Sequence, residues 1–308
     1  MEFDVSAAAA DRPHYWTTLE EGEAIRAQLN LIRDGSRILE VGTAAGHVTR
    51  LLKRKGGIVI GIEMDEDLAA LATPLCDRMI IGDVETLDLD VDVPETFDVI
   101  LCGDVLEHLK DPGAVLRKLR RRLGPEGYLV VSLPNVAHAS VRLSLLAGEF
   151  TYVREGLLDA THLRFFTLAS MVELFNRCGF EIRDLYRAKQ GPFDTEIRVS
   201  PLRVNAFALR DIIKDREATS YQFVFRAVPS ERSNSIAELD DHRFDATVEQ
   251  RDLSARCLRE AMAIQESVVP ADWSLVHSWA RLSLVLRPSL KALLYCLSSL
   301  VRVKLWRN

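Results

Sequence analysis

Strand-like apolar runs alternate with helix-period stretches from Ser36 to Phe225, and this alternation limits the folds open to the chain more than any other feature. The pattern is typical of a mostly parallel sheet covered by helices on both faces. The predicted fold class is therefore α/β, a doubly wound seven-stranded sheet with a helical C-terminal extension. We expect the strands at Arg37 to Val41, Ile58 to Ile62, Met79 to Ile81, Phe97 to Cys102, Tyr128 to Leu133, Phe180 to Tyr186 and Tyr221 to Arg226.

The first predicted strand leads into a turn of small residues. Glu40 lies near its end, and Gly42, Thr43 and Gly46 follow before the next helix. Only small residues let the backbone turn tightly there and approach a ligand. Dinucleotide sites use a related turn, but His47 stands where they need glycine or alanine. This departure disfavours NAD.

Further candidate ligands stand at the ends of the next three strands. Glu63 follows the second strand, where a carboxylate can accept hydrogen bonds from both hydroxyls of a ribose. Asp83 follows the third, placed to accept an adenine amino group, and Asp104 follows the fourth. Four acids in order at successive strand ends are a more specific signal than any one of them. Their neighbours in the predicted site are Met64, which would pack on the adenine, Val84 and Gly103.

Residues 36 to about 186 resemble class I S-adenosylmethionine-dependent methyltransferases of the ubiquinone-biosynthesis and type 11 and 23 group. The stretch from Val105 to Leu109, which reads VLEHL and precedes Asp111-Pro112, and the turn from Leu123 to Gly127 carry the resemblance. It implies a Rossmann-like sheet, S-adenosylmethionine as cofactor, and the glycine-rich turn after Glu40 as motif I. Ala44 replaces the usual central glycine of that turn, and Glu126 replaces the first glycine of the usual pair. Neither departure removes a ligand group.

Three histidines are candidate general bases. His108 follows the fourth strand, His138 begins the long segment after the fifth, and His162 lies at the end of that segment in an HLRFFT stretch that the resemblance includes. Methyl transfer to a hydroxyl requires removal of a proton, which histidine can accept near neutral pH. The alternative for each is a structural role: ordering a turn for His108, packing for His138, and fixing the segment through Asp159 for His162.

The chain is expected to divide into a cap over residues 1–30, a catalytic domain over 31–228, a linker and charged helix over 229–269, and a basic tail over 270–308. His14, Tyr15 and Trp16 would anchor the cap or close it over the cofactor. Segments 134–166 and 188–220 are too long for plain connections, so we place the acceptor pocket there.

We expect an O-methyltransferase acting on a hydroxyl of a sugar, glycan or secondary metabolite. A phenol or quinone-precursor methyltransferase is the alternative within the enzyme class. A protein of another class, a cofactor-binding scaffold without chemistry, is also open. Glu63, Asp83 and the Glu107-His108 pair argue against the scaffold, which would not need them.

Charge and cysteine usage indicate the compartment and exclude some partners. The formal net charge is −6, and an acidic body argues against nucleic acid as a partner. The five cysteines lack C-x-x-C spacing, so we expect reduced core residues of a cytoplasmic protein and no metal site. The N-terminus has no basic region followed by an apolar stretch, which argues against a signal peptide.

The tail predicts an amphipathic helix. Residues 281–308 contain six Lys or Arg and no acid, so the preceding residues carry −12. One stripe collects Leu290, Leu293, Leu294, Leu297, Leu300 and Val301, with Lys291, Ser298, Ser299 and Arg302 opposite. Such a helix can attach peripherally to the inner face of a membrane. The alternative is docking through the same stripe, on the core or on a second subunit as a homodimer.

Overall fold

The computed structural model describes residues 22–239, 246–266 and 272–306. The expected cap residues His14, Tyr15 and Trp16 lie outside the described residues. The chain forms two compact units. The sheet unit consists of Met1–Asn135, Tyr152–Ala188 and Gln222–Asp240, and the helical unit consists of Val136–Thr151, Lys189–Tyr221 and Asp241–Asn308.

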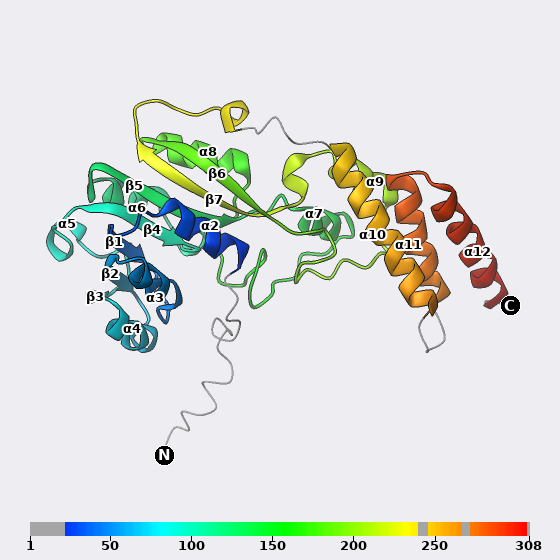
Figure 1. The fold of residues 1–308 in the computed structure, drawn as a ribbon, viewed down its shortest axis with the longest axis horizontal. Helices are drawn as coiled ribbons and strands as arrows, with labels where there is room; N and C mark the ends of the chain where they lie inside the picture. Colours follow the sequence, from blue (N-terminus) through cyan, green and yellow to red (C-terminus); the bar gives the residue numbers. More distant parts are fainter. Residues whose placement is uncertain (1–21, 240–245, 267–271, 307–308) are drawn as a thin grey trace, which may run out of the picture. The chain divides into compact units, whose positions relative to one another are not determined.

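The sheet has seven strands in the order β3-β2-β1-β4-β5-β7-β6, as drawn in Figure 1. Strands β1 to β5 pair in parallel, and β7 pairs antiparallel with β5. All seven predicted strands are confirmed, with ends extended by up to five residues; the largest extension is in β5, which includes the segment Leu123 to Gly127 that was expected to be a turn. The observed bounds are β1 Arg37–Val41, β2 Ile58–Glu63, β3 Arg78–Ile81, β4 Phe97–Gly103, β5 Leu123–Pro134, β6 Phe180–Lys189 and β7 Ser220–Pro229.

Helices cover both faces of the sheet. Successive strand residues point to opposite faces, and Leu39 and Ile38 accordingly belong to two different buried clusters. The cluster around Leu39 includes side chains of α6 and α8, and the cluster around Ile38 includes side chains of α2 and α3. The doubly wound arrangement predicted from sequence is thus confirmed. The helices and 3-10 turns of this unit are α2 Glu23–Leu31, α3 His47–Arg54, α4 Glu66–Ala72, η1 Thr73–Leu75, α5 Leu89–Asp92, η2 Leu106–His108, α6 Pro112–Arg120, α8 Leu168–Arg177 and η4 Ile236–Leu239.

The helical unit has its own apolar core, to which α9, α10 and α11 contribute Leu209, Cys257 and Val276. Its elements are α7 Ala139–Leu146, α9 Ala206–Ile212, η3 Arg216–Ala218, α10 Ala246–Glu266, α11 Trp273–Leu286 and α12 Leu290–Trp306. Helices α10, α11 and α12 run side by side in chain order (Figure 1). The structure thus groups parts of both expected acceptor segments with the C-terminal helices, so the role of those parts in acceptor binding stays a prediction.

All five cysteines are free thiols, and Cys102, Cys178 and Cys257 are buried. Their burial in apolar surroundings agrees with the expected structural role. Among the described residues, no helix combines the length and the hydropathy needed to cross a membrane.

Candidate functional site

The parallel register brings the ends of three strands together at one edge of the sheet. Val41 at the end of β1 lies opposite Ile62 of β2 on one side and Cys102 of β4 on the other. The residues that follow, Gly42 and Glu63 among them, therefore share one edge, as expected for parallel strands. The amide of Gly42 donates to the carbonyl of Ile62 at 2.8 Å, which holds the first turn against the second strand.

The turn after β1 uses a left-handed backbone three times. Gly42 has φ +73°, Ala44 has φ +44°, and Gly46, the residue before α3, has φ +81°. A side chain on Gly42 would also collide with Val105, 2.8 Å from where its Cβ would stand. Ala44 thus adopts a conformation that costs a non-glycine residue about 1 to 2 kcal/mol. This strain explains why glycine is usual at that position.

Glu63 joins the turns that follow β1 and β2. One carboxylate oxygen accepts from the amide of Ala44 at 2.8 Å, and the other accepts from the amides of Met64 and Asp65 at 2.8 and 3.0 Å. A carboxylate has about four acceptor positions, so one remains on the oxygen that binds Ala44. A ribose hydroxyl can use that position directly, whereas the expected bidentate contact would require a loop amide to give way. Met64 beside it is 69% exposed, as a residue available to an adenine face would be.

Glu40 is buried under the same turn. One of its carboxylate oxygens accepts from the hydroxyl of Thr49 at 2.6 Å. Burial raises the pKa of Glu40 to about 8, the hydrogen bond from Thr49 lowers it, and the charge of Glu63 raises it further. Glu40 therefore carries a proton in the folded protein over much of the range in which an ordinary carboxyl is ionised.

The turn after β3 is less enclosed. Asp83 is half-buried, and one of its carboxylate oxygens accepts from the amide of Glu85 at 2.8 Å. Val84 is buried and packs in the core of the sheet unit. Asp83 thus offers its second oxygen at the surface of the turn, whereas Val84 anchors the turn from below.

The end of β4 carries a polar network that the motifs alone do not reveal. Asp104 has φ +56°, and its carboxylate accepts from the hydroxyl of Ser132 at 3.0 Å and from the amide of Gln222. Burial raises the pKa of Asp104, and these two hydrogen bonds lower it. The side-chain amide of Gln28 on α2 donates to Ser132 at 3.1 Å, and its buried oxygen lies 2.8 Å from where a Cβ of Gly103 would stand.

That oxygen of Gln28 has no hydrogen-bond partner among the described residues. Gln28 and Ser132 are thus candidates for the methionine end of the cofactor, next to Gly103 and Asp104. No sequence signal singles out Gln28, because it lies in a helix before the first motif.

His138 is held in a structural role. Its Nδ1 accepts from the amide of Ser140 at 3.2 Å and so caps α7, and its Nε2 contacts the carbonyl of Gln190 at 3.0 Å. Since a carbonyl only accepts, Nε2 carries the proton, and the lone pair of Nδ1 is already engaged by the amide of Ser140. Burial lowers the pKa of His138 to about 4. His138 therefore fits its packing alternative better than the role of base.

His162 is half-buried beside the buried Glu107, and each has a buried atom without a hydrogen-bond partner. Nδ1 of His162 and one carboxylate oxygen of Glu107 lack a hydrogen-bond partner among the described residues. The other nitrogen of His162 bonds the backbone of Leu157. Burial lowers the pKa of His162 to about 4 and raises that of Glu107 well above its usual range. Burial thus favours a neutral imidazole on His162 and a protonated carboxyl on Glu107, and such a pair offers one acceptor and one donor to a third group.

His108 is oriented by its neighbours in the loop. Its Nδ1 lies 3.3 Å from the carbonyl of Thr161 and 3.1 Å from the Thr161 hydroxyl. That hydroxyl donates to the carboxylate of Asp159 at 2.6 Å. A hydroxyl has one proton, so toward His108 it acts as an acceptor. Both partners of Nδ1 are then acceptors, which fixes the proton on Nδ1 and leaves the lone pair on Nε2.

Glu107, His108 and His162 form one cluster. One ligand atom from each lies within 4.8 Å of the others, and the two imidazole rings meet edge to face with centroids 4.8 Å apart. A carboxylate and two imidazoles are also donors that a divalent cation accepts. The absence of C-x-x-C spacing predicted no metal site, and the 54 positions between His108 and His162 hid this cluster from the sequence pattern. Leu163 and Arg164 join the two segments by donating their amides to the carbonyl of Glu107 at 2.8 and 2.9 Å.

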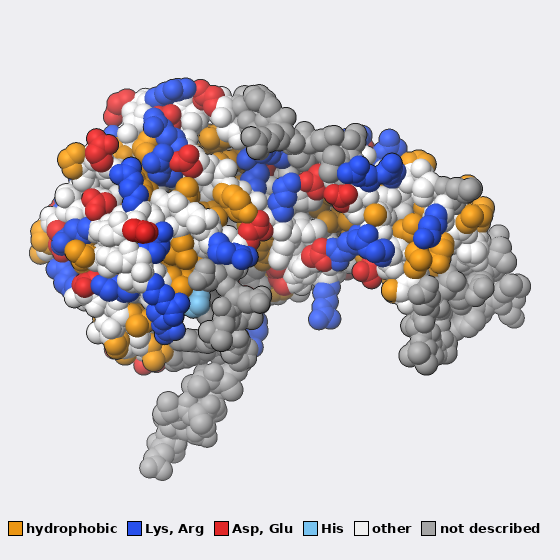
Figure 2. Space-filling view, viewed as in Figure 1, with side chains coloured by type: hydrophobic (Ala, Val, Ile, Leu, Met, Phe, Trp, Pro, Cys, Tyr) orange, Lys and Arg blue, Asp and Glu red, His pale blue; other side chains and the backbone are white. Residues whose placement is uncertain are grey.

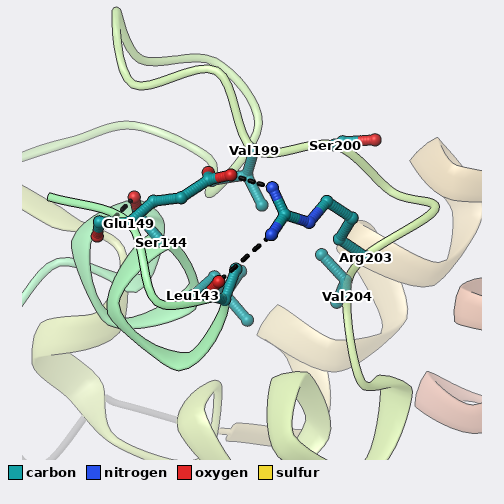
Figure 3. Close-up of a pocket in the computed structure, with 8 residues that line it drawn as sticks. Leu143, Ser144, Glu149, Val199, Ser200, Arg203 and Val204 are labelled. Atoms are coloured by element: carbon teal, nitrogen blue, oxygen red, sulfur yellow. Dashed lines mark hydrogen bonds and ion pairs between the residues drawn. The ribbon is translucent and has the colours of Figure 1, made fainter. Parts of the chain in front are cut away.

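A separate pocket lies in the helical unit between α7 and residues 199–204 (Figure 3). Arg203 crosses it to form an ion pair with Glu149 and a hydrogen bond to the carbonyl of Ala147. The remaining space is on the scale of one water molecule. This pocket is too small to hold an acceptor.

The fold is that of a class I S-adenosylmethionine-dependent methyltransferase, and the acids at the strand ends and the glycine-rich turn after β1 agree with this class. Residues 11–185 match the family described as a methyltransferase domain of type 23, and the chain belongs to this family. Its cofactor is S-adenosylmethionine. This match confirms the family resemblance that was based on the VLEHL stretch and on the segment from Leu123 to Gly127.

Curated relatives and solved structures of similar sequence or fold carry related names. The chain is 29% identical over 174 residues to a ubiquinone biosynthesis O-methyltransferase of Pseudomonas entomophila, covering 54% of this chain and 73% of the relative. It is 33% identical over 130 residues to one of Bradyrhizobium diazoefficiens, covering 42% and 51%. A methyltransferase structure from Thermotoga maritima, described as a possible histamine N-methyltransferase, superposes with a TM-score of 0.48 at 21% identity, covering 68% and 87%.

We expect Glu63→Gln to weaken binding of S-adenosylmethionine by about 1.5 to 3 kcal/mol, the usual range for loss of a charged hydrogen-bond partner. Glutamine keeps the shape but removes the charge and one acceptor oxygen. Titration calorimetry on the folded variant measures the change. Glu66→Gln, an exposed acid in the first turn of α4, is the matched control and should bind normally. Equal affinity for both variants would overturn the assignment of Glu63.

Glu40 should make stability depend on pH. A carboxyl whose pKa is raised on folding stabilises the folded state below its unfolded pKa, and this contribution is lost as pH rises through the folded value of about 8. Urea unfolding of wild type without cofactor should therefore lose stability between about pH 5 and 8. Glu40→Gln, which keeps an acceptor for Thr49, should reduce that loss by at least about 1 kcal/mol. Identical pH dependence in the two proteins would show that Glu40 is ionised when folded.

Proposed function

We propose that the protein transfers the methyl group of S-adenosylmethionine to a hydroxyl oxygen of an acceptor, with His108 as general base. The observation that carries this proposal is the fixed tautomer of His108, whose Nδ1 faces the two oxygens of Thr161. Its Nε2 lone pair is then free to accept the proton of the acceptor. His138, in contrast, has both ring nitrogens in hydrogen bonds, and burial lowers the pKa of both His138 and His162 to about 4.

The atoms of the cluster that lack a hydrogen-bond partner support a hydroxyl as the acceptor group. A hydroxyl donates one hydrogen bond and accepts others, and it complements the imidazoles and the carboxyl of Glu107, whose protonation is favoured by burial. Methyl transfer from a sulfonium is an in-line displacement in which orientation of the oxygen supplies much of the rate. In this mechanism the carboxyl of Glu107 donates to the oxygen, and Nε2 of His108 takes the single proton of the hydroxyl as the new carbon–oxygen bond forms and the carbon–sulfur bond of the sulfonium breaks.

The class of acceptor rests on the names of the relatives. They are ubiquinone biosynthesis O-methyltransferases, which supports the phenol or quinone-precursor alternative over a sugar, glycan or other metabolite. A phenolic hydroxyl also ionises more readily than a sugar hydroxyl, so a histidine suffices as its base. The non-catalytic scaffold is disfavoured, because a scaffold gains nothing from the two buried atoms of Glu107 and His162 that lack a partner and cost stability.

The full chain should methylate a catechol-type phenol in the presence of S-adenosylmethionine and leave simple sugars unmodified. Mass spectrometry of the product identifies the methylated atom, and formation of S-adenosylhomocysteine gives the rate. Methylation of sugars alone would reverse the choice of acceptor while leaving the transferase assignment intact. Cofactor binding without turnover on either class of acceptor would instead favour the scaffold.

Loss of the base should lower kcat with little change in cofactor affinity. We expect His108→Ala to reduce turnover about 10²- to 10⁴-fold. Thr161→Val, which removes the hydroxyl that orients the ring, should give a smaller loss, and Thr161→Ser should restore activity. Normal turnover of His108→Ala at neutral pH would contradict the base assignment.

A chelator separates this mechanism from one that uses a bound cation. If His108 acts only as a base, EDTA leaves the wild-type rate unchanged. Loss of activity with EDTA, restored by added Mg²⁺ or Zn²⁺, would show that His108 and its two neighbours act as metal ligands instead.

A further inference from the structure

Helix α12 packs against α11 through small and polar side chains. Ala292 and Ser299 are fully buried, and Cys296 is half-buried. Nδ1 of His277 on α11 contacts the carbonyl of Cys296 and the hydroxyl of Ser299, both at 3.2 Å. Positions 292, 296 and 299 are spaced as one face of a helix, so this is the docked face of α12.

The leucines of the predicted apolar stripe lie on the exposed side instead. Leu293, Leu294 and Leu297 are 40%, 57% and 51% exposed. Their spacing places them together on one surface of α12, and Lys291 nearby is also exposed. These three side chains therefore do not dock on the core, which was one of the alternatives left open by the sequence. Side chains of Leu290, Leu300 and Val301 lie outside the described set.

Two partners remain for this surface, a membrane and a second copy of the chain, and the charge of the segment distinguishes them. Residues 281–308 carry six basic residues and no acid, and hydrophobic and basic side chains lie next to one another over the C-terminal helices in Figure 2. A two-fold dimer through α12 would bring two such segments of like charge together, which is unfavourable. An anionic surface complements both the leucines and the charge.

We propose that the exposed face of α12, defined by Leu293, Leu294 and Leu297, binds the surface of a membrane rich in anionic phospholipid. The helix lies in the plane of the interface, with the leucines at the boundary between headgroups and acyl chains and the basic residues near phosphate groups. Because the docked face holds α12 on α11, the protein attaches as a folded body. This inference is independent of the proposed reaction.

The test uses the full chain and sedimentation with two kinds of vesicle, phosphatidylcholine alone and phosphatidylcholine mixed with phosphatidylserine. Wild type should bind the mixed vesicles, bind the neutral vesicles more weakly, and lose binding to the mixed vesicles as salt rises. Leu294→Ser/Leu297→Ser should weaken binding to the mixed vesicles by about tenfold or more, since both apolar contacts are lost. Cofactor affinity should not change.

Leu71→Ser is the matched control, because Leu71 on α4 is 53% exposed and lies in the sheet unit. It should bind vesicles as wild type does. Equal binding of wild type and the double variant to the mixed vesicles would overturn the proposal. Light scattering that shows a wild-type dimer, converted to monomer by the double variant, would assign the surface to a second copy and overturn it as well.

Discussion

The parallel register of β1, β2 and β4 is the constraint on which the site depends. It sets the ends of three strands side by side, so the residues after them share one edge. Glu63 then ties two of those turns together through three amide hydrogen bonds. The left-handed conformation of Gly42 and Ala44 is the geometric cost of bringing the first turn that close. A shift of one residue would turn Glu63 to the other face of the sheet.

Burial of acids gives this edge its electrostatic character. Glu40 and Glu107 are buried and Asp104 is more exposed, and loss of solvent around the carboxyl is the largest cause of the raised pKa of each. Such carboxyls are costly when ionised without a partner. S-adenosylmethionine carries a sulfonium and an ammonium group, and positive charge nearby favours ionisation of a carboxyl. Cofactor binding and the protonation of this edge are therefore coupled, whichever of the three lies nearest the cation.

Local sequence patterns were sufficient to predict the strands, because an apolar run is a property of neighbouring residues. The bounds of β1 follow from its apolar run and match the sequence-based expectation. The roles of the three histidines could not be separated in this way, because hydrogen bonds from distant residues decide them. Gln190 fixes the tautomer of His138 across 52 positions, and Thr161 fixes that of His108 across 53.

Helix α12 is a second case in which the sequence pattern does not reveal a tertiary contact. Periodicity groups Leu293, Leu294 and Leu297 on one surface, as the structure does, but it does not say which surface of the helix docks. Close packing on α11 favours small side chains, and Ala292 and Ser299 supply them. Each of these leucines is about half exposed and so forgoes about half of the roughly 1.5 to 3 kcal/mol that full burial of a leucine contributes. The fold of the helical unit alone does not account for three such leucines. A partner surface that covers the leucines would account for their exposure. The excess of basic residues in the same segment favours an anionic partner surface.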